Sequence, residues 1–557
     1  MESSTPLETQ IAGSKEDSTN AAPIAAADPV DIPAPPWWSA FTHPTFAVIW
    51  AASTAGLIGI AMSDTASGWL MTSLNADPAA VSMVLVAANL PMFLFTLLAG
   101  ALADIFDSRR FLLVVETGIA ILTIIFAGMV SLGAVTPALL LAITFVLSAA
   151  WTMAAPAWLS IVPLLVPKRD LDGATAIDGA SYNVSRALGP AFGGGAMAAF
   201  GLAAPFWIFS ACNLGSIAAL LWWRAPRKAP ESLPVERLSS ALRTGIRHAA
   251  NNRHLSSTLA RTLAFFPFAS AYWALLPLLA RNQMTGGPQY FGALLGAIGA
   301  GAIGGALAVN WLKAKLGPDR LVAAGTVATA IVLVLFGVVR DPNLGVVICL
   351  IAGASWILVL TSLYVSAQVA LPDWVRGRGL AIFLTAIFGA MTAGSAIWGQ
   401  IAERYGLPAA NFVAAAGILL ALPLTWRWKV QTGAEVDLTP SMHWRPPHVD
   451  HRIENRQGPV LVTVEYWINS ADRSAFLEAV EEMGHERKRD GAYAWGVFED
   501  ATDEGHFWES FLIESWLEFL HLRERVTKAD RVLEDRVRLL LKSPPKPTFM
   551  VRARRPS

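Results

Sequence analysis

Long apolar stretches alternate with short polar turns along most of this chain. Each stretch holds about 20 or more mostly apolar residues, and they fall into two groups of six: 46–73, 80–103, 111–133, 137–165, 174–200 and 203–223, then 257–280, 289–312, 320–339, 344–370, 379–402 and 407–428. A helix of about 20 residues crosses the ~30 Å hydrocarbon core of a bilayer. Because lipid offers the backbone no hydrogen-bond partners, only helices and closed barrels cross it, and these stretches are too long for barrel strands. The pattern therefore predicts an all-α membrane part with twelve transmembrane helices.

After Lys429 the pattern changes to shorter segments that are dense in charged residues. Residues 460–468 mix β-branched and aromatic side chains, as strands do, and residues 472–489 repeat apolar side chains at helical spacing. The remaining segments predict strands at 493–500, 506–515 and 548–552 and one helix at 517–542. The order βαββαβ predicts a C-terminal α+β domain of the ferredoxin-like type.

Composition supports a membrane protein. Of the 557 residues, 54% are hydrophobic and only 15% are charged, and the mean hydropathy is +0.47. The formal net charge is zero, so the chain has no overall attraction to nucleic acid. Cys212 and Cys349 both lie inside apolar stretches, so we expect neither a disulfide framework nor a metal site.

The distribution of charge and Pro divides the chain into parts. The first 45 residues are rich in Ala, Pro, Ser and acidic residues and lack the apolar core of a secretory signal, so we expect a disordered tail. The six predicted parts are a disordered cytoplasmic tail (1–45), an N-terminal six-helix bundle (46–223), a basic cytoplasmic linker (224–256), a C-terminal six-helix bundle (257–428), a second linker (429–455) and the ferredoxin-like domain (456–557).

Basic residues lie mainly on one side of the predicted helices. One set of turns, together with the central linker, carries sixteen Lys and Arg residues, whereas the opposite set carries only Arg281, Arg340 and Arg404. Cytoplasmic loops of membrane proteins carry the excess of basic residues. We therefore expect both termini, the central linker and the C-terminal domain to lie in the cytoplasm.

The two groups of helices repeat one another. A shift of 205 positions brings similar residues together after a basic turn: Pro167 and Pro372, Gly189 and Gly394, Gly194 and Gly399, and Gly201 and Gly406. The pattern predicts two six-helix repeats.

A charged turn separates the second and third apolar stretches. Its sequence is Gly100-Ala-Leu-Ala-Asp104-Ile-Phe-Asp107-Ser-Arg109-Arg110. This turn resembles the loop between helices two and three of the major facilitator superfamily, in the form found in the branch of the enterobactin exporter and related secretion effectors. It departs from the usual pattern at Ile105, where a basic residue is common, and at Asp107, where Gly is common.

The resemblance implies a fold and a role for this turn. The fold is that of the major facilitator superfamily, two parallel six-helix repeats with a substrate cavity at their interface. The role is a cytoplasmic gate, for which the candidate residues are Gly100, Asp104, Asp107, Arg109, Arg110 and Glu116. We expect Glu116, which lies early in the third stretch, to pair with Arg109 or Arg110.

A second motif lies in the fifth stretch, Arg186-Ala-Leu-Gly189-Pro190-Ala-Phe-Gly193-Gly194-Gly195. It resembles the Gly-Pro antiporter motif of exporters in the same superfamily. Proline bends a helix and glycines let a neighbouring helix approach closely. The glycines of the eighth stretch offer the partner surface, namely Gly292, Gly296, Gly301, Gly304 and Gly305. The alternative is tight packing of membrane helices without any link to export.

Charged side chains inside the membrane are costly and usually functional. Asp64 lies about 18 residues into the first stretch, roughly 27 Å from its start, where a carboxylate suits proton coupling or substrate binding. Arg186 lies deep in the fifth stretch and shares a helical face with Asn183 and Pro190. It is a candidate partner of Asp64 or a clamp for an anionic substrate. Asn89 is a weaker candidate for the cavity wall. A structural ion pair or a helix anchor remains an alternative role for these residues.

Taken with the resemblance, these features predict a proton-coupled exporter in the bacterial inner membrane. Its substrate would be a small molecule such as a siderophore, a drug or a hydrophobic metabolite. No Walker loop is found, so ATP is not the expected energy source, and we expect no catalytic residue, cofactor or metal. The alternatives are an uptake carrier, a lipid flippase, or a membrane-anchored monooxygenase that uses the C-terminal domain.

The C-terminal domain resembles the antibiotic-monooxygenase type of ferredoxin-like domain, which implies a homodimer. An enzymatic pocket there would draw on His485, Asn469, Trp495, Trp516 and their neighbours His506, Trp508 and His521. We favour a dimerising or regulatory role over an enzymatic one.

Overall fold

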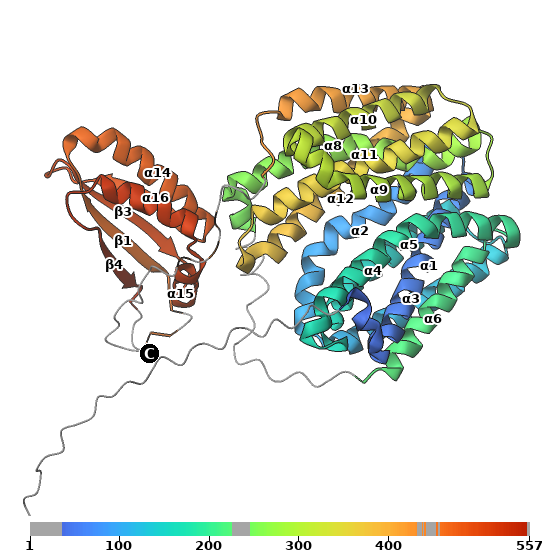
Figure 1. Cartoon of the computed structure of the whole chain (residues 1–557), viewed down its shortest axis with the longest axis horizontal. Helices are drawn as coiled ribbons and strands as arrows, with labels where there is room; N and C mark the ends of the chain where they lie inside the picture. The colour runs from blue at the N-terminus through green and yellow to red at the C-terminus, as the bar shows by residue number, and fades with distance from the viewer. Residues whose placement is uncertain are drawn as a thin grey trace, which may run out of the picture.

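The structure is a computed structural model that describes residues 36–224, 246–431, 437, 439, 441, 453–454 and 457–553. Most of the predicted N-terminal tail, the middle of the basic linker and most of the second linker lie outside the described residues. Two groups of long helices lie side by side, and a small α/β domain lies beyond one end of them (Figure 1). We call that end of the helices the tail side, the opposite end the far side, and the α/β domain the tail domain.

The first bundle contains six long helices. They are α1 (Pro44–Leu74), α2 (Pro78–Ile105), α3 (Ser108–Ser131), α4 (Pro137–Leu165), α5 (Leu171–Phe200) and α6 (Ala204–Trp222). Short 3₁₀ turns at Trp37–Thr42 and Lys168–Asp170 meet on the tail side, where Asp170 accepts hydrogen bonds from Ser39 and His43. These hydrogen bonds hold the pKa of Asp170 below its ordinary value.

The second bundle also contains six long helices. They are α8 (Arg253–Leu278, continued by a π-helical turn at Leu279–Gln283), α9 (Pro288–Leu316), α10 (Pro318–Val338), α11 (Pro342–Val369), α12 (Asp373–Tyr405) and α13 (Leu407–Thr425). Several helices begin at or next to a proline, which suits the first turn because the proline nitrogen has no hydrogen to leave unsatisfied. Two helices begin earlier than predicted, α8 at Arg253 and α12 at Asp373, because their charged first turns are helical although they are not apolar.

Eleven of these helices are long and apolar enough to cross a membrane. The remaining one, α5, is as long as its neighbours, but Asn183, Arg186 and a run of glycines lower its hydropathy. It packs between α1 of its own bundle and α9 of the other. Eleven of the twelve predicted spans are therefore confirmed, and Asn183 and Arg186 of α5 are exposed although the helix packs against two neighbours.

The glycines of the Gly-Pro motif bring α5 against two helices. Gly189 and Gly193 face Ala61 and Met62 of α1, and Gly194 faces Gly292 of α9. A Cβ atom at Gly292 would lie 2.6 Å from the carbonyl oxygen of Pro190 and 2.7 Å from the Cα of Gly194. Only glycine therefore permits this contact between the two bundles.

The prediction for the glycines of α9 was wrong in part. Gly292 and Gly296 face α5 as expected, but Gly301 and Gly305 face α11, and a Cβ atom at Gly304 would meet open space. The reason is helical geometry, since residues nine or more positions past Gly292 have moved to another face and to the level where α11 crosses. Gly299, which was not predicted, faces Ala187 of α5.

α12 makes the equivalent contacts in the second bundle. Gly394 faces Pro267 of α8, in its own bundle, and Gly399 faces Ser82 of α2, in the other bundle. These are the residues that a shift of 205 positions aligned with Gly189 and Gly194. α5 and α12 are thus the helices through which each bundle approaches the other.

The tail domain contains a four-stranded antiparallel sheet. Its elements are β1 (Val460–Trp467), α14 (Arg473–Arg489), β2 (Tyr493–Glu499), β3 (His506–Ile513), α15 (Trp516–Arg525), α16 (Lys528–Leu539) and β4 (Lys546–Val551), with a short 3₁₀ turn at Ser470–Asp472. The strand order is β2-β3-β1-β4. Alternate residues of β1 and β3 pack under the helices in two apolar clusters, which include Val462, Phe511 and Phe519 in one and Phe476 and Phe507 in the other.

The single helix predicted at 517–542 is wrong, because two helices occupy this range. α15 ends at Arg525 and α16 begins at Lys528. Thr527 and Asp530 form a capping box, in which the Thr527 hydroxyl accepts from the Asp530 N–H and the Asp530 carboxylate accepts from the Thr527 N–H. Such a box satisfies the free N–H groups of a helix start, so it favours a new helix over a continuous one.

Substitution of Gly292 by Ala is expected to destabilise the contact between α5 and α9. Because the added methyl group would meet backbone atoms of α5, we expect a loss of about 1–3 kcal/mol, seen as a lower thermal unfolding midpoint in detergent. The matched control is Gly304→Ala on the same helix, where the methyl group meets no atom within 4 Å. Equal midpoints for the two variants would contradict the close contact.

Candidate substrate and coupling site

Asp64 and Arg186 lie near each other in the first bundle. Asp64, on α1, is exposed although its neighbours Ser63 and Thr65 are buried, and Arg186, on α5, is also exposed. Their charges interact, but no ion pair within 4.0 Å joins them. The Arg186 guanidinium also interacts with Tyr272 of α8, which is fully buried in the second bundle. Asp64 lies one turn before Gly68, which faces Pro277 and Phe291 of the second bundle, and Arg186 lies one turn before Pro190, whose carbonyl faces Gly292. Both charges therefore lie on the side of the first bundle that meets the second.

Aromatic residues of the second bundle complete this region. Tyr272 and Trp273 of α8 pack against Trp356 of α11, with ring centroids 6.5 Å and 5.5 Å from it. The Tyr272 hydroxyl and the Trp273 indole N–H are buried, and neither makes a hydrogen bond of normal geometry with a described group. A ligand with acceptor atoms could use such donors. Sequence reasoning missed these residues, although a Tyr-Trp pair inside an apolar helix was a visible signal.

The two predicted asparagines differ in position. Asn183 is exposed on α5, one turn from Arg186, and donates a hydrogen bond to the Gly179 carbonyl of its own helix at 3.0 Å. Asn89 is buried on α2 and donates to the Leu85 carbonyl at 3.0 Å. Asn183 thus shares the face of Arg186, whereas the Asn89 amide is used inside its own helix.

The charged turn between α2 and α3 is anchored within the first bundle. Asp107 caps the start of α3, where it accepts a hydrogen bond from the Arg110 N–H at 2.9 Å. The Arg109 side chain donates to the Leu220 and Leu221 carbonyls at the end of α6, at 2.8 and 3.1 Å. A guanidinium at this place interacts favourably with the negative end of the α6 dipole.

The other residues of the turn are less informative. A Cβ atom at Gly100 would meet no atom within 4 Å. The side chain of Asp104 lies outside the described residues. The gate role of the whole group therefore stays a prediction, and Arg109 has a structural role as the cap of α6.

Glu116 does not pair with Arg109 or Arg110, so this expectation was wrong. It is buried on α3 and accepts a hydrogen bond from the Trp158 indole of α4 at 2.9 Å. The Asn213 amide of α6 also donates to it once its oxygen and nitrogen are placed to satisfy both groups. Glu116 lies two turns along α3 from the charged turn, where neighbouring helices supply polar partners and the basic side chains do not reach.

The two bundles are joined on the far side, beyond Asp64. Arg281, at the end of α8, donates to the Thr72 carbonyl and hydroxyl of α1 at 2.5 and 3.0 Å. Trp69 of α1 stacks on Phe291 of α9 with ring centroids 5.8 Å apart. Asp64 lies about one and a half turns closer to the tail side than Trp69 and about two turns closer than Thr72, so this closed end covers the region around Asp64.

The sequence of this chain matches a known family. The model of the family described as transmembrane secretion effector matches residues 36–556, which is nearly the whole chain. The chain belongs to this family. It is therefore a multi-pass membrane transport protein of the efflux type, within the major facilitator superfamily.

Several relatives of this secretion effector are transporters. The multidrug efflux pump Tap of Mycolicibacterium fortuitum is 24% identical over 391 residues, which cover 68% of this chain and 93% of Tap. The enterobactin exporter EntS of Escherichia coli O1:K1 is 26% identical over 351 residues, which cover 60% of this chain and 80% of EntS.

Solved transporters share the fold at low identity. The nucleoside transporter NupG, as its D323A mutant, has a TM-score of 0.53 at 14% identity, and the match covers 69% of this chain and 99% of NupG. A POT family transporter in complex with a thioalcohol-conjugated peptide has a TM-score of 0.56 at 12% identity, over 68% of this chain and 94% of that transporter.

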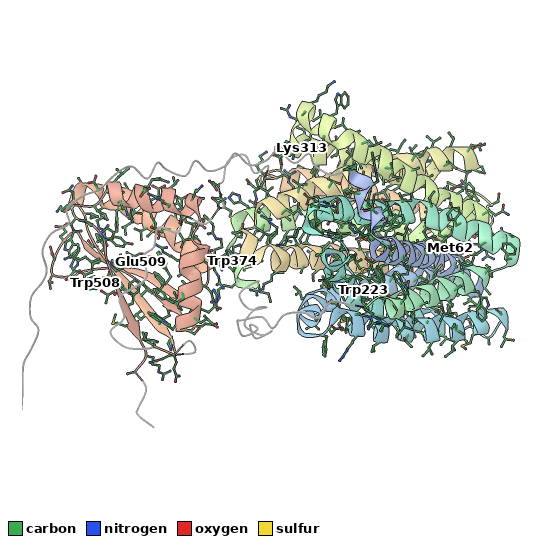
Figure 2. All side chains as sticks on the ribbon, turned by 60° about the horizontal axis from the view of Figure 1, so that its bottom comes forward. Met62, Trp223, Lys313, Trp374, Trp508 and Glu509 are labelled. Atoms are coloured by element: carbon green, nitrogen blue, oxygen red, sulfur yellow. The ribbon has the colours of Figure 1, made fainter. Side chains whose placement is uncertain are left out.

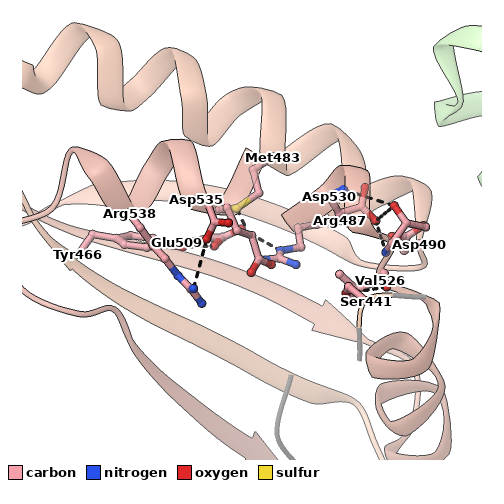
Figure 3. A network of polar contacts seen from close by, with 12 residues as sticks. Ser441, Tyr466, Met483, Arg487, Asp490, Glu509, Val526, Asp530, Asp535 and Arg538 are labelled. Carbon is pink, nitrogen blue, oxygen red and sulfur yellow. Dashed lines mark hydrogen bonds and ion pairs between the residues drawn. The ribbon is translucent and has the colours of Figure 1, made fainter. Parts of the chain in front are cut away.

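The tail domain of this secretion effector contains a buried polar network (Figure 3). Glu509 of β3 is fully buried and accepts hydrogen bonds from the Tyr466 hydroxyl at 2.7 Å and the Trp495 indole at 2.8 Å. Arg487 of α14 forms an ion pair with Glu534 of α16 at 2.8 Å. These partners give a structural role to Trp495, which had been a candidate pocket residue.

The histidines considered for an enzymatic pocket do not come together. His506 stacks on Trp467 on one face of the sheet, with ring centroids 4.7 Å apart. His485 is exposed on α14 and His521 lies on α15, on the face that the helices cover. Of the candidate pocket residues, His506 and Trp508 lie together, with ring centroids 5.5 Å apart, whereas the three histidines lie on different elements.

The position of Arg109 leads to a stability prediction. We expect Arg109→Gln to lower the stability of the first bundle by about 1–2 kcal/mol, because two carbonyls at the end of α6 lose a charged donor. The matched control is Arg110→Gln, whose side chain is exposed and makes no described side-chain hydrogen bond. The thermal unfolding midpoint in detergent measures both, and a larger loss for Arg110→Gln would contradict the assignment.

Proposed function

We propose that this chain exports a small molecule across the bacterial inner membrane by alternating access, driven by the proton gradient. The observation that carries the proposal is the exposed carboxylate of Asp64 near Arg186, between two bundles. The proposal includes α5 as a twelfth span and two six-helix repeats, which the equivalent contacts of α5 and α12 support. It also places the tail side and both termini in the cytoplasm, which the excess of basic residues there supports.

Asp64 is proposed as the proton carrier and Arg186 as its partner. Without a proton on Asp64, the negative charge of the carboxylate and the positive charge of Arg186 balance. A substrate with a cation or with hydrogen-bond donors binds the ionised carboxylate, whereas a proton neutralises it and displaces such a substrate. Because substrate and proton then compete for one group, their movements are opposite, which is antiport.

The alternative role of Arg186 as an anion clamp gives a different coupling. An anionic substrate must compete with Asp64 for the guanidinium, so a proton on Asp64 would strengthen its binding. Proton and substrate would then move together, which does not drive export against an inward proton gradient. Export by this pair therefore favours neutral or cationic substrates with several donor groups over anionic ones.

Loss of the carboxylate is expected to abolish coupling. We expect Asp64→Asn to fold normally but to lose efflux driven by a pH gradient, because the amide cannot carry the proton. The measurement is substrate-triggered collapse of the pH gradient in inverted vesicles, with a panel of cationic drugs, neutral drugs and siderophores. The matched control is Asp77→Asn, an exposed residue before α2 on the far side. Gradient-driven efflux by Asp64→Asn would remove this residue from the mechanism.

We also propose that the tail domain is a ferredoxin-like module that pairs two copies of the chain. The antiparallel order β2-β3-β1-β4 supports the fold type. The face of the sheet opposite Glu509 carries Trp508, with Phe498 and Met550 exposed on its two edge strands (Figure 2 labels Trp508 and Glu509). An exposed apolar sheet face of this kind is typical of an interaction surface.

A charge on this face is expected to separate the two copies. We expect Phe498→Glu to convert a dimer into a monomer, since the carboxylate would be buried without a partner. Light scattering of the detergent-solubilised chain gives the mass. Val532→Glu, at an exposed position on α16 away from the sheet, is the matched control. A monomer for the unmodified chain, or a dimer that survives Phe498→Glu, would contradict the proposal.

A further inference from the structure

The tail domain contacts the helical part through a short helical segment just before α8, residues 246–251. Arg247 in this segment donates to the Gly491 carbonyl at 2.8 Å and to the Glu514 carboxylate at 3.2 Å. Its guanidinium also lies 5.9 Å from the ring centre of Tyr493. Gly491, Tyr493 and Glu514 belong to the tail domain, so one arginine contacts two loops and a strand of that domain.

The next residue, His248, is fully buried at the same boundary. Its ring meets the Trp374 ring edge-on, with centroids 5.4 Å apart, and its Nε2 lies 3.3 Å from the Asn252 amide. Burial and the guanidinium groups of Arg489 and Arg525 lower the pKa of His248 to about 3. The imidazole is therefore neutral at physiological pH, and it packs here as an uncharged ring.

Asn252 connects this segment to the second bundle. Its side-chain oxygen caps the start of α8 by accepting from the His254 and Leu255 N–H groups at 3.0 Å each. Its amide donates to the Ala370 carbonyl at the end of α11 at 2.8 Å. The segment is thus fastened to two helices of the second bundle.

Trp374 is the point where the tail domain reaches α12. It lies in the first turn of that helix, and the Arg525 guanidinium of α15 lies 4.2 Å from its ring centre. Figure 2 shows Trp374 at the boundary between the tail domain and the helices. A cation stacked on tryptophan contributes about 0.5–2 kcal/mol, more when it is shielded from water, and Arg525 is buried.

We propose that the hub formed by Arg247, His248, Asn252, Trp374 and Arg525 fixes the tail domain to the second bundle, and that the tail domain thereby controls α12 and the opening of the tail side. The docking stands on the contacts above, and only the control of opening rests on the proposed function. The partner of this surface is the chain's own tail domain, and the hub joins it to α8, α11 and α12 of the second bundle.

α12 is suited to carry this control. It has 33 residues, so it is about 50 Å long and reaches from the hub to the far side. Along this length Gly389 meets Phe93 and Gly399 meets Ser82, both on α2 of the first bundle. Because a packed helix moves as a stiff rod, a shift at Trp374 changes the contact between the bundles.

Distances between spin labels test the docking in the full chain. The pairs are Val532 with Lys315 of the second bundle, and Val532 with Trp222 of the first, each changed to Cys after replacement of Cys212 and Cys349 by Ala. All three labelled positions are exposed. A Gly292→Trp substitution would wedge the bundles apart on the far side, because that contact admits no side chain.

We expect Gly292→Trp to change the Val532–Trp222 distance, from the tail domain to the first bundle, by several ångström. The Val532–Lys315 distance, from the tail domain to the second bundle, should stay unchanged and keep a single value. A broad distance to the second bundle in the unwedged chain, or equal changes in both distances, would overturn the docking. If neither distance changes, the bulkier double variant Gly194→Trp with Gly292→Trp is measured. If both distances stay constant in that variant as well, the docking is overturned.

Removal of the hub tests the control of opening. In the double variant Arg247→Ala with Arg525→Ala, we expect the distribution of Val532–Lys315 distances to broaden at least twofold. We also expect the Trp222–Lys315 distance across the tail side to shift. The matched control, Arg536→Ala, removes an exposed ion pair with Glu482 inside the tail domain and should change neither distance. Broadening without a shift across the tail side would overturn the control while leaving the docking.

The distances between the labels do not depend on transport activity. A failure of Asp64→Asn to stop efflux would overturn the proposed coupling and leave the label distances as they are. Conversely, an undocked tail domain in the unmodified chain would overturn the hub and leave proton-driven efflux untouched.

Discussion

The absence of water from the hydrocarbon core is the constraint on which this structure depends. Backbone groups there must pair within the chain, so the spanning segments are helices, and each helix must pack without the aid of a hydrophobic effect between helices. Close approach then requires small residues where helices cross. The contact of Gly194 with Gly292, and that of Gly399 with Ser82, meet this requirement between the two bundles.

The same constraint explains where charge occurs. The charges of Asp64 and Arg186 lie within a bundle interface, where each compensates the other, whereas Glu116 is buried among hydrogen-bond donors from α4 and α6. α5 carries so many polar and glycine residues that it lacks an apolar stretch long enough to cross a membrane, and it packs against α1 and α9. This helix thus carries two of the functional candidates, Asn183 and Arg186.

The features that could be predicted from the sequence are those that depend on residues close together in the chain or on a regular repeat. Apolar length predicts twelve spans, of which eleven are confirmed, and the 205-residue shift identifies glycines that meet equivalent helices, because these signals are local or periodic. The split between α15 and α16 was also local, since Thr527 and Asp530 have capping-box spacing, and it was overlooked. The partners of Glu116 and the contact of Arg247 with Glu514 join residues far apart in the chain, so no pattern along the sequence could indicate them.

The charges of the proposed site also determine which forces act on transport. With Asp64 ionised, the pair with Arg186 is neutral, so a site loaded with a neutral substrate moves across the membrane with no net charge. With Asp64 protonated, the site carries one positive charge, and moving it through the membrane potential is worth about 2.3 kcal/mol per 100 mV. A cell interior that is negative pulls the protonated form inward and leaves the substrate-loaded form unaffected. The return step, and not the export step, would then draw on both the pH gradient and the potential, which suits an exporter of uncharged molecules.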